Sequence, residues 1–543
     1  MTDADLPAND QNPILPVLKR PVYWLLCVLL ALPAAVPYFT HYFVDTKGLV
    51  PTGFIQYDMP YYMALARGYF TDGHFHLTYG NPFSASYDTP RIYFQPLTLV
   101  LALLLRVTAL SPGAVFMMVG AVAAVLCVMV GLLTYRQIVG LKDRVDWIGL
   151  VLFIWGGGLL VVASIAYSIM WKRPLKPFRL DPFNGWWFLN FGRNLVYPTE
   201  AFYHFLFLGS VFSAVKKNYA LSAVAAFLVS LSHPFTGVEL LCILCAWSFL
   251  ELVIGHKGQL PWGFFLITCG LLLVHLFYYW FFLRQFAEHR SVVTQWMLPW
   301  TLHYFNIIPA YALVAVFALW RVRKIALAKQ FFAVRHNRLL LVWFVVAFSL
   351  AKHDLFIHPV QPLHFTRGYI WMPLFLIGAP TLIALLRTLC APPAHLVRVV
   401  AAILLVALFL TDNACWLGSF LRSSDQGIRM TCNQAAVISW MGKLPREKFL
   451  VIAQEPSIGY MATVYTQFRA WRSHIYNTPD SLLRQSELDS FYREHYFLPA
   501  WKGQPLLVVV DVADRPLNDQ WMIQAGGKLV FNNKSFEVFE VRP

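Results

Sequence analysis

Long apolar runs separated by short polar breaks fill the first 420 residues of the chain. A helix needs about 20 apolar residues to cross the hydrocarbon layer of a bilayer. Twelve runs come close to that length, so the pattern predicts a polytopic α-helical membrane protein. These runs cover roughly residues 22–44, 94–110, 113–135, 147–169, 198–215, 219–235, 237–254, 261–283, 299–320, 339–357, 369–387 and 398–418.

The polar breaks predict how the chain is oriented in the membrane. Segment 321–338, RVRKIALAKQFFAVRHNR, holds six Arg or Lys residues and no acid, which indicates a cytoplasmic loop. Three runs follow it, so the tail is expected on the outer side. Lys19 and Arg20 place the N-terminus inside, and an outer tail then requires an odd number of crossings. One of the twelve runs must be wrong, and we expect the error within 171–254. The prediction is 11 or 13 transmembrane helices.

Two segments differ from the apolar bundle. Residues 45–93 form a long first external loop within a transmembrane domain that covers 1–420. From 421 to 543 the predicted strands, among them 449–454 and 506–511, alternate with predicted helices. That alternation is typical of a small α/β domain, which the orientation places outside the cytoplasm.

Composition agrees with this interpretation and excludes one class of partner. Only 13% of the 543 residues are charged, whereas a soluble chain carries about a quarter. The net charge of +15 lies mostly in breaks between apolar runs, where cytoplasmic sorting explains it. No basic domain or nucleic-acid motif is present, so nucleic-acid binding is not predicted.

Asp58 is the first candidate for chemistry. It stands in the first external loop, at the start of the predicted helix YDMPYYMALARGYF, and a carboxylate there can act as a general base. The alternative is a plain helix N-cap, which Asp also favours. Tyr57 precedes it. A second acid of this loop, Asp88, either assists Asp58 or forms a local ion pair with Arg91, and the ion pair is the simpler interpretation.

Other ionisable residues occur next to or inside apolar runs. Glu200 and His204 are four residues apart and share a helix face with access to the same cavity as Asp58. His233 either lies deeper in that cavity or is a satisfied core histidine at a proline kink, which we favour. The tail residues Arg469, Arg472 and His474 are typical of a solvated face and are assigned no chemistry.

The layout resembles the GT-C superfamily of integral membrane glycosyltransferases. The resemblance rests on one long first run, a large external loop with an early acid, many further runs and an outer α/β tail. Tyr57-Asp58-Met59-Pro60-Tyr61-Tyr62 occupies the place of the family's first-loop acid. The chain lacks the Asp-Glu pair of protein mannosyltransferases. Its Trp186-Trp187 is followed by Phe188, unlike the WWDYG motif of oligosaccharyltransferases.

The resemblance implies a hexosyl- or pentosyltransferase of the bacterial inner membrane with a periplasmic tail. Its donor would be an undecaprenyl-phosphate-linked sugar, its acceptor a lipid, glycan or protein, and membrane lipids would surround it. The implied base is Asp58. The basic candidates are the proposed phosphate ligands Arg91, Arg193, Arg367 and His364, with His353 and His358 beside them; the alternative is interfacial snorkelling.

Two further expectations concern metals and the competing class of function. Some family members use a divalent cation such as Mg²⁺ or Mn²⁺, but the spacings of five and six residues among His353, His358 and His364 do not suit one helix face, so no metal ligand is predicted. The alternative function is a transporter or lipid flippase. Transporters commonly carry a two-half repeat, and none is obvious here.

Overall fold

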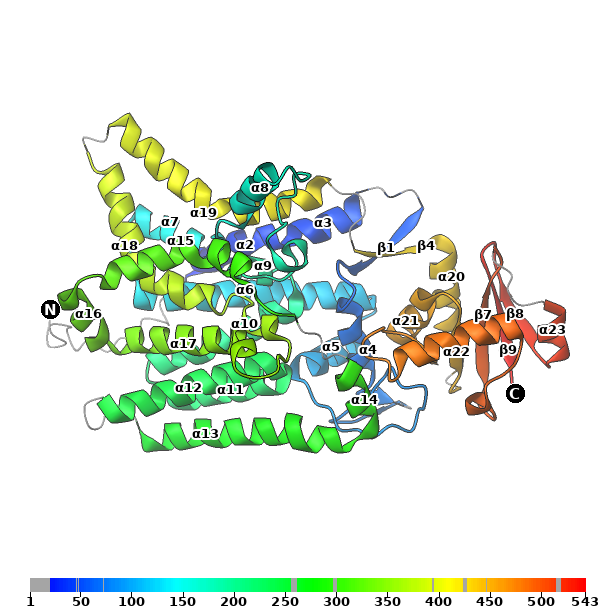
Figure 1. Ribbon diagram of the computed structural model, residues 1–543. Helices are drawn as coiled ribbons and strands as arrows, with labels where there is room; N and C mark the ends of the chain where they lie inside the picture. Colours follow the sequence, from blue (N-terminus) through cyan, green and yellow to red (C-terminus); the bar gives the residue numbers. More distant parts are fainter. Residues whose placement is uncertain are drawn as a thin grey trace.

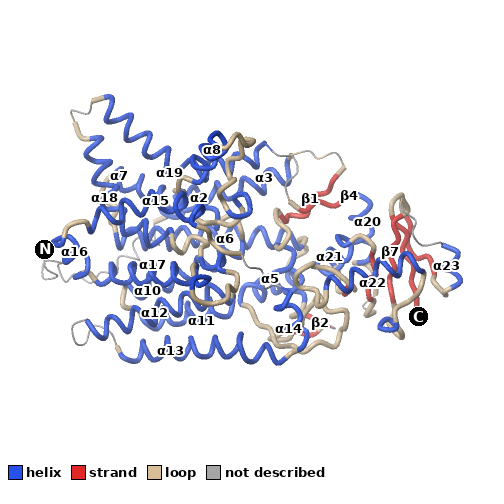
Figure 2. The backbone as a smooth tube through the Cα atoms, in the orientation of Figure 1, coloured by secondary structure: helices blue, strands red, loops and turns tan. Residues whose placement is uncertain are grey.

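The computed structural model describes residues 20–44, 46, 48–71, 73–254, 261–295, 300–392, 395–422, 427–445, 447–513 and 519–543. Figure 1 shows an elongated molecule in which a bundle of roughly parallel helices carries the C-terminal sheet at one end. Figure 2 shows that the strands gather at that end, where the first loop and the tail meet. The opposite end is made of helix ends and connecting segments.

Within the described ranges, seven helical segments are long and apolar enough to cross a membrane. Two bent pairs raise the number to nine if each pair is one span. The seven are α2 (Pro21–Ala31) continued by η2 (Leu32–Ala35) and α3 (Val36–Phe43), α6 (Pro112–Ile138), α12 (Pro234–Ile254), α13 (Trp262–Leu276) continued by η4 (Phe277–Phe282) and η5 (Leu283–Gln285), α15 (Tyr304–Val322), α18 (Trp371–Cys390) and α19 (Leu396–Arg422). The pairs are α7 (Arg144–Trp155) with α8 (Leu160–Met170), and α16 (Ile325–Ala333) with α17 (Arg335–Ala351).

Two further helices also run between the two ends of the bundle. Helix α10 (Pro198–Val215) starts against Gly120 in the first half of α6, and the next residue, Lys216, bonds Gln137 at the end of α6. Helix α11 (Tyr219–Ser232) returns beside it. If both of these helices also cross, the described residues make eleven passes with the nine segments above, and eleven is one of the two predicted numbers.

The run that does not cross is 94–110, so the expectation that the error lies within 171–254 is wrong. Its helix, α5 (Pro96–Val107), has 12 residues and a length of about 18 Å, well short of a bilayer core of about 30 Å. Tyr69 of the first loop bonds the backbone of Gln95 at its start. Its last turn lines a pocket together with tail residues. Both ends of α5 therefore lie at the tail end of the molecule, and run length alone could not reveal this.

The basic segment 321–338 and the tail lie at opposite ends of the bundle (Figure 1). Helix α16 and the start of α17 carry this segment. Arg338 of α17 pairs with Glu251 near the end of α12, at distances of 2.6 and 2.8 Å. The chain thus separates its most basic connection from its C-terminal sheet, as the charge pattern predicts.

The tail forms a five-stranded sheet in the order β6-β5-β7-β9-β8. Its strands are β5 (Leu450–Ala453), β6 (Arg469–Ala470), β7 (Leu506–Asp511), β8 (Lys528–Asn532) and β9 (Phe536–Val541). Strands β5, β6 and β7 are parallel, whereas β9 is antiparallel to both of its neighbours. The helices are α20 (Cys432–Met441), α21 (Pro456–Tyr465), α22 (Ser481–Glu494) and α23 (Asp519–Gln524).

Alternation along β5 and β7 explains the two faces of this sheet. Val451 and Val509 belong to the apolar core that continues into the helical bundle. Ile452 and Val508 belong to a second cluster under α22. Since successive side chains of a strand point to opposite faces, these runs bury both faces of the sheet. These elements match the predicted α/β pattern, while the division into domains at residue 420 stays a prediction.

A small antiparallel pairing joins the first loop to the start of the tail. Strand β1 (Leu49–Phe54) pairs with β4 (Ile428–Thr431), with Leu49 opposite Thr431 and Val50 opposite Met430. The first loop also contains α4 (Met59–Arg67) and the short hairpin β2 (Phe70–Thr71) and β3 (His74–Phe75). The loop and the tail therefore form one outer assembly over the bundle.

Candidate active site

Asp58 immediately precedes α4, but its side chain makes no capping hydrogen bond to that helix. The simple N-cap interpretation is therefore wrong. Pro60 occupies the first turn, and Gly68 ends the helix as the sequence indicates. The Asp58 side chain is 42% exposed. Its carboxylate is thus available for contacts other than the backbone of its own helix.

Two side chains hold the Asp58 carboxylate. His474 Nε2 lies 3.1 Å from Oδ1, and Gln56 Nε2 donates to Oδ2 at 3.1 Å. The Asp58 backbone N–H donates to Gln56 Oε1 at 2.8 Å, and this oxygen also accepts from the Tyr197 hydroxyl at 3.0 Å. Gln56 therefore links the carboxylate to the bundle, whereas His474 links it to the tail.

The other nitrogen of His474 identifies the tautomer. Nδ1 faces the backbone N–H of Tyr476 at 3.2 Å and the side-chain amide of Asn477 at 3.0 Å. Since a backbone N–H can only donate, Nδ1 must accept. A neutral ring then carries its proton on Nε2 and donates it to Asp58. Burial lowers the pKa of His474, although the bond to Asp58 and that residue's charge raise it in part, and this favours the neutral ring.

The pKa of Asp58 reflects opposing effects. Burial raises it, while the hydrogen bonds and charge of its neighbours lower it more. These neighbours are His474, Gln56 and, through charge alone, Arg367. The net pKa lies below the ordinary value of 3.8, so Asp58 is ionised at neutral pH.

Aromatic rings surround His474 and fix its position. Its ring centroid lies 4.8 Å from that of Tyr57, 5.1 Å from Tyr460 and 5.7 Å from Phe83. The backbone of Tyr57 accepts from the Tyr460 hydroxyl at 3.0 Å, and its own hydroxyl accepts from the N–H of Ile475 at 3.0 Å. Tyr57, a predicted cavity residue, thus ties the first loop to the tail directly beside Asp58.

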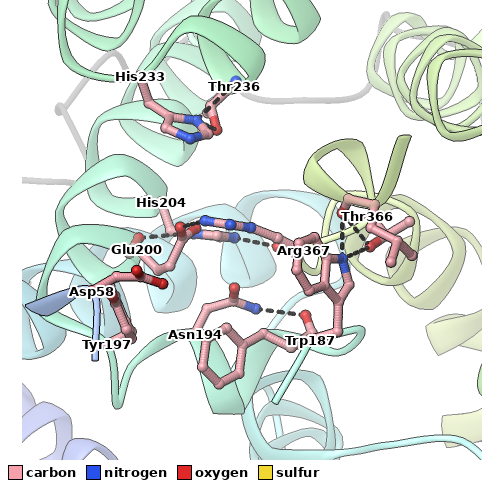
Figure 3. A network of polar contacts seen from close by, with 12 residues as sticks. Asp58, Trp187, Asn194, Tyr197, Glu200, His204, His233, Thr236, Thr366 and Arg367 are labelled. Atoms are coloured by element: carbon pink, nitrogen blue, oxygen red, sulfur yellow. Dashed lines mark hydrogen bonds and ion pairs between the residues drawn. The ribbon is translucent and has the colours of Figure 1, made fainter. Parts of the chain in front are cut away.

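Arg367 and Glu200 lie on the bundle side of Asp58, as Figure 3 shows. Arg367 forms an ion pair with Glu200 and stacks over Trp187 at 5.2 Å. His204, one turn after Glu200, contacts the backbone oxygen of Arg367 at 2.7 Å through Nε2. The structure therefore brings together four of the predicted residues, Asp58, Glu200, His204 and Arg367, from three distant parts of the chain.

Arg193 is placed differently from its predicted role. Its guanidinium is fully buried and bonds Asp181 at 2.7 Å, the Gly185 backbone oxygen at 2.9 Å and Asn413 at 3.2 Å. Neither side chain of this pair is exposed, whereas the Arg367 side chain is 16% exposed, so Arg193 forms a structural ion pair with no surface open to a ligand. The preceding residues 187–190 form a buried irregular segment, and Trp186 before them is half-buried. We leave Arg193 out of the phosphate ligands.

Two of the predicted histidines, His233 and His364, lie beside each other with ring centroids 5.5 Å apart, whereas His353 and His358 lie in the loop before His364. His364 stacks on Phe235 at 4.4 Å, within reach of the charge of Asp58. His233 accepts from the N–H of Thr236 at 3.2 Å, so it caps α12 as a satisfied core histidine at the proline kink. His353 Nε2 accepts from Val360 N–H at 2.8 Å and supports its own loop, and His358 is exposed.

Two predicted residues of the first loop lie away from Asp58. Arg91 lines a separate pocket at the far end of α4. Asp88 is exposed, and the ion pairs found among the described residues include none between it and Arg91. Neither residue belongs to the group around Asp58.

The tail residues were the main omission of the sequence interpretation. His474 is fully buried rather than solvated. The positive charge of Arg472 partly offsets the rise in the pKa of Tyr57 that burial causes. His474 lies in an irregular stretch between β6 and α22, with no periodicity and no motif around it. Its role depends on a contact between residues 416 positions apart, and no local signal could have revealed it.

The side chains at this site do not form a recognisable metal site. In the described ranges no group of three His, Cys, Asp or Glu residues is placed to hold an ion. The Asp58 oxygens already accept from His474 and Gln56, and Glu200 is paired with Arg367. This donor set does not fit Mg²⁺ or Mn²⁺, which need several oxygen ligands. We therefore derive no step through a metal ion.

The arrangement of helices and sheet is similar to the fold of solved membrane glycosyltransferases of the GT-C type. The chain is a multi-pass membrane protein of this fold. No family model matches the sequence, and no curated protein matches it.

Solved structures carry the comparison. The Archaeoglobus fulgidus oligosaccharyltransferase tethered to an acceptor peptide aligns with a TM-score of 0.51 and 12% identity, over 91% of this chain and 70% of that one. The archaeal oligosaccharyltransferase AglB from the same organism was solved in complex with an inhibitory peptide and a dolichol-phosphate. It aligns with a TM-score of 0.54 and 13% identity, over 90% of this chain and 70% of that one. ArnT from Cupriavidus metallidurans aligns with a TM-score of 0.46 and 12% identity, over 96% of this chain and 98% of that one. At these identities the two oligosaccharyltransferase structures, whose TM-scores exceed 0.5, show a likeness in fold alone.

Proposed function

We propose that the chain is a glycosyltransferase that uses a polyprenyl-phosphate sugar. In this proposal it lies in a bacterial inner membrane with the tail in the periplasm. It moves a hexose or pentose from an undecaprenyl-phosphate carrier to a lipid, glycan or protein acceptor, with Asp58 as general base. The fold and the complex of a structural neighbour with dolichol-phosphate support a lipid-linked donor.

The observation that carries the proposal is the state of the Asp58 carboxylate. It is ionised, partly exposed and held from two sides, and it does not cap its own helix. A base must be within hydrogen-bond reach of the proton it removes, and it must be unprotonated at working pH. Asp58 meets the second condition, and its exposure leaves room for an acceptor hydroxyl.

The reaction then proceeds by displacement at the sugar. Asp58 accepts the proton of the acceptor hydroxyl while the acceptor oxygen bonds to the anomeric carbon. The bond from that carbon to the carrier phosphate breaks, and the carrier leaves as its phosphate anion. The proton passes from Asp58 to solvent or to this phosphate, which restores the carboxylate.

Cationic and neutral neighbours have separate tasks in this scheme. Arg367 places positive charge on the bundle side of Asp58, where it would stabilise the departing phosphate. His474 is a positioning residue, since it orients the carboxylate through Nε2 and is itself held by the tail. We therefore expect a variant without His474 to keep the Asp58 carboxylate but to hold it in the wrong orientation.

The test is transfer of labelled sugar by the purified full-length protein. It would be mixed with a panel of radiolabelled polyprenyl-phosphate sugars and a membrane extract as acceptor. Asp58→Asn is expected to lower kcat by about 10²- to 10⁴-fold, because it removes the base while keeping the shape. Asp88→Asn, an exposed acid of the same loop, serves as the matched control.

Three results would overturn the proposal. The first is that no label moves from any donor. The second is that Asp58→Asn retains full turnover. The third is that Asp88→Asn loses as much activity as Asp58→Asn, since the effect would then follow loop charge rather than the carboxylate at position 58.

A further inference from the structure

A second pocket lies at the other end of α4, away from Asp58. The helix has nine residues, so its two ends are separated by about 13 Å. The pocket has a volume of about 310 Å³ and is built by the first loop, α5 and the tail. Among the described residues, one acid, Glu447, and five cations line it; the cations are Arg67, Arg91, Arg106, Lys448 and Arg469.

The positive charge of this pocket is not balanced by its acid. Glu447 pairs with Arg542 at 2.7 Å. Among the described residues, no ion pair links a carboxylate to Arg67, Arg91, Arg106 or Arg469. A cluster of this sign concentrates anions around it, and guanidinium groups match phosphate geometry.

Two of the arginines are fixed by the backbone. Arg67 Nη2 donates to the Tyr465 backbone oxygen at 2.9 Å, and Arg469 donates to Ser84 at 3.3 Å and to Ser86. Burial lowers the pKa of each to about 10, which still leaves both cationic at neutral pH. These bonds join the tail to the first loop and hold a preformed positive wall. Arg91, Arg106 and Lys448 are exposed.

The helix that contributes Leu105 and Arg106 to the pocket also carries an exposed apolar face. On α5, Val100, Leu103 and Val107 are 40%, 46% and 76% exposed, and their spacing of three and four places them on one helix face. Helix α5 does not cross the membrane but lies at its outer end. An exposed apolar face beside cations at that level is typical of a helix lying in the membrane interface.

We propose that this pocket binds the phosphate of an anionic lipid from the outer leaflet, with the lipid chains over Val100, Leu103 and Val107. The cations select the headgroup, and the apolar face of α5 selects a lipid over a soluble phosphate. The proposal does not depend on sugar transfer at Asp58. It assigns to the first loop and the tail a shared contact with the bilayer.

The test is lipid binding by the purified full-length protein in neutral detergent, measured by native mass spectrometry. The probes are dioctanoyl phosphatidic acid, dioctanoyl phosphatidylcholine and inorganic phosphate. The acid is expected to bind on the order of tenfold more tightly than the choline lipid. Arg91→Gln with Arg106→Gln is expected to reduce its affinity about 25-fold, since each surface cation contributes about a factor of five.

The matched control is Arg173→Gln with Lys176→Gln, which removes two exposed cations from another loop. It is expected to keep wild-type affinity. Equal loss in both double variants would overturn the proposal, because any surface charge would then suffice. Equal affinity for the two lipids, or for phosphatidic acid and inorganic phosphate, would overturn it as well. Thermal unfolding of each variant confirms that the fold is retained.

Discussion

At the scale of single residues, the proposed base depends on a histidine 416 positions further along the chain. Asp58 is recognisable from sequence because it follows the first span and opens a helix. His474 is not, because nothing near it in sequence differs from a solvated loop. Arg193 illustrates the opposite error. In sequence, an arginine that binds phosphate cannot be told from one that pairs with a carboxylate. Only the fold shows that Asp181 lies beside Arg193.

The His474 contact gives a prediction for pH dependence. Replacing His474 with Phe removes a hydrogen bond that lowers the pKa of Asp58 and leaves burial, which raises it. The pKa of Asp58 therefore rises, and the acid limb of kcat/KM shifts to higher pH. His474→Gln keeps a donor and is expected to shift the limb less. The measurement is kcat/KM against pH for both variants and wild type; coincident acid limbs would contradict the link.

At the scale of elements, the sequence predicts nearly every helix, because twenty apolar residues in a row leave few alternatives. What it could not predict is which run fails to cross. Helix α5 is apolar like its neighbours, and only its contacts with Tyr69 and the tail show that both ends stay on one side. The tail strands were predictable for a similar reason, since β5 and β7 are short apolar runs between helices.

Packing between α6 and α10 gives a second prediction. A Cβ at Gly120 would lie 2.4 Å from the Pro198 side chain, at the start of α10, whereas a Cβ at Gly209 on α10 meets nothing within 4 Å. Gly120→Leu is expected to destabilise the protein by about 1–3 kcal/mol, because the two helices must separate. Gly209→Leu is the matched control and should be nearly neutral. Thermal unfolding in detergent measures both, and equal losses would show that the contact is not selective.

At the scale of the whole molecule, an odd number of passes would put the N-terminus and the tail on opposite sides of the membrane. The positive charge of segment 321–338 predicts that the tail is the part outside. Sequence alone predicted this orientation but could not decide between 11 and 13 crossings. The deciding contacts are tertiary, because they join α5 to the tail.

Two exposed cysteines test the topology. Cys390 lies at the end of α18, on the side of the basic segment, and Cys432 lies at the start of α20 in the tail. In right-side-out spheroplasts, a membrane-impermeant maleimide should label a variant with Cys432 as its only cysteine. A variant with Cys390 as its only cysteine should react only after the membrane has been permeabilised. Labelling of both in intact spheroplasts would contradict the crossing of α19, which lies between the two cysteines, and the reversed pattern would contradict the orientation.

The pairing of β1 with β4 has a consequence for how the protein is made. Leu49 leaves the ribosome about 380 residues before its partner Thr431, which at 5–20 residues per second is a delay of roughly 20 to 80 s. Throughout that interval the first loop has no partner strand, and Asp58 has no His474. The outer assembly therefore closes only when translation is nearly finished, and a nascent or prematurely terminated chain holds its carboxylate without the partner that orients it.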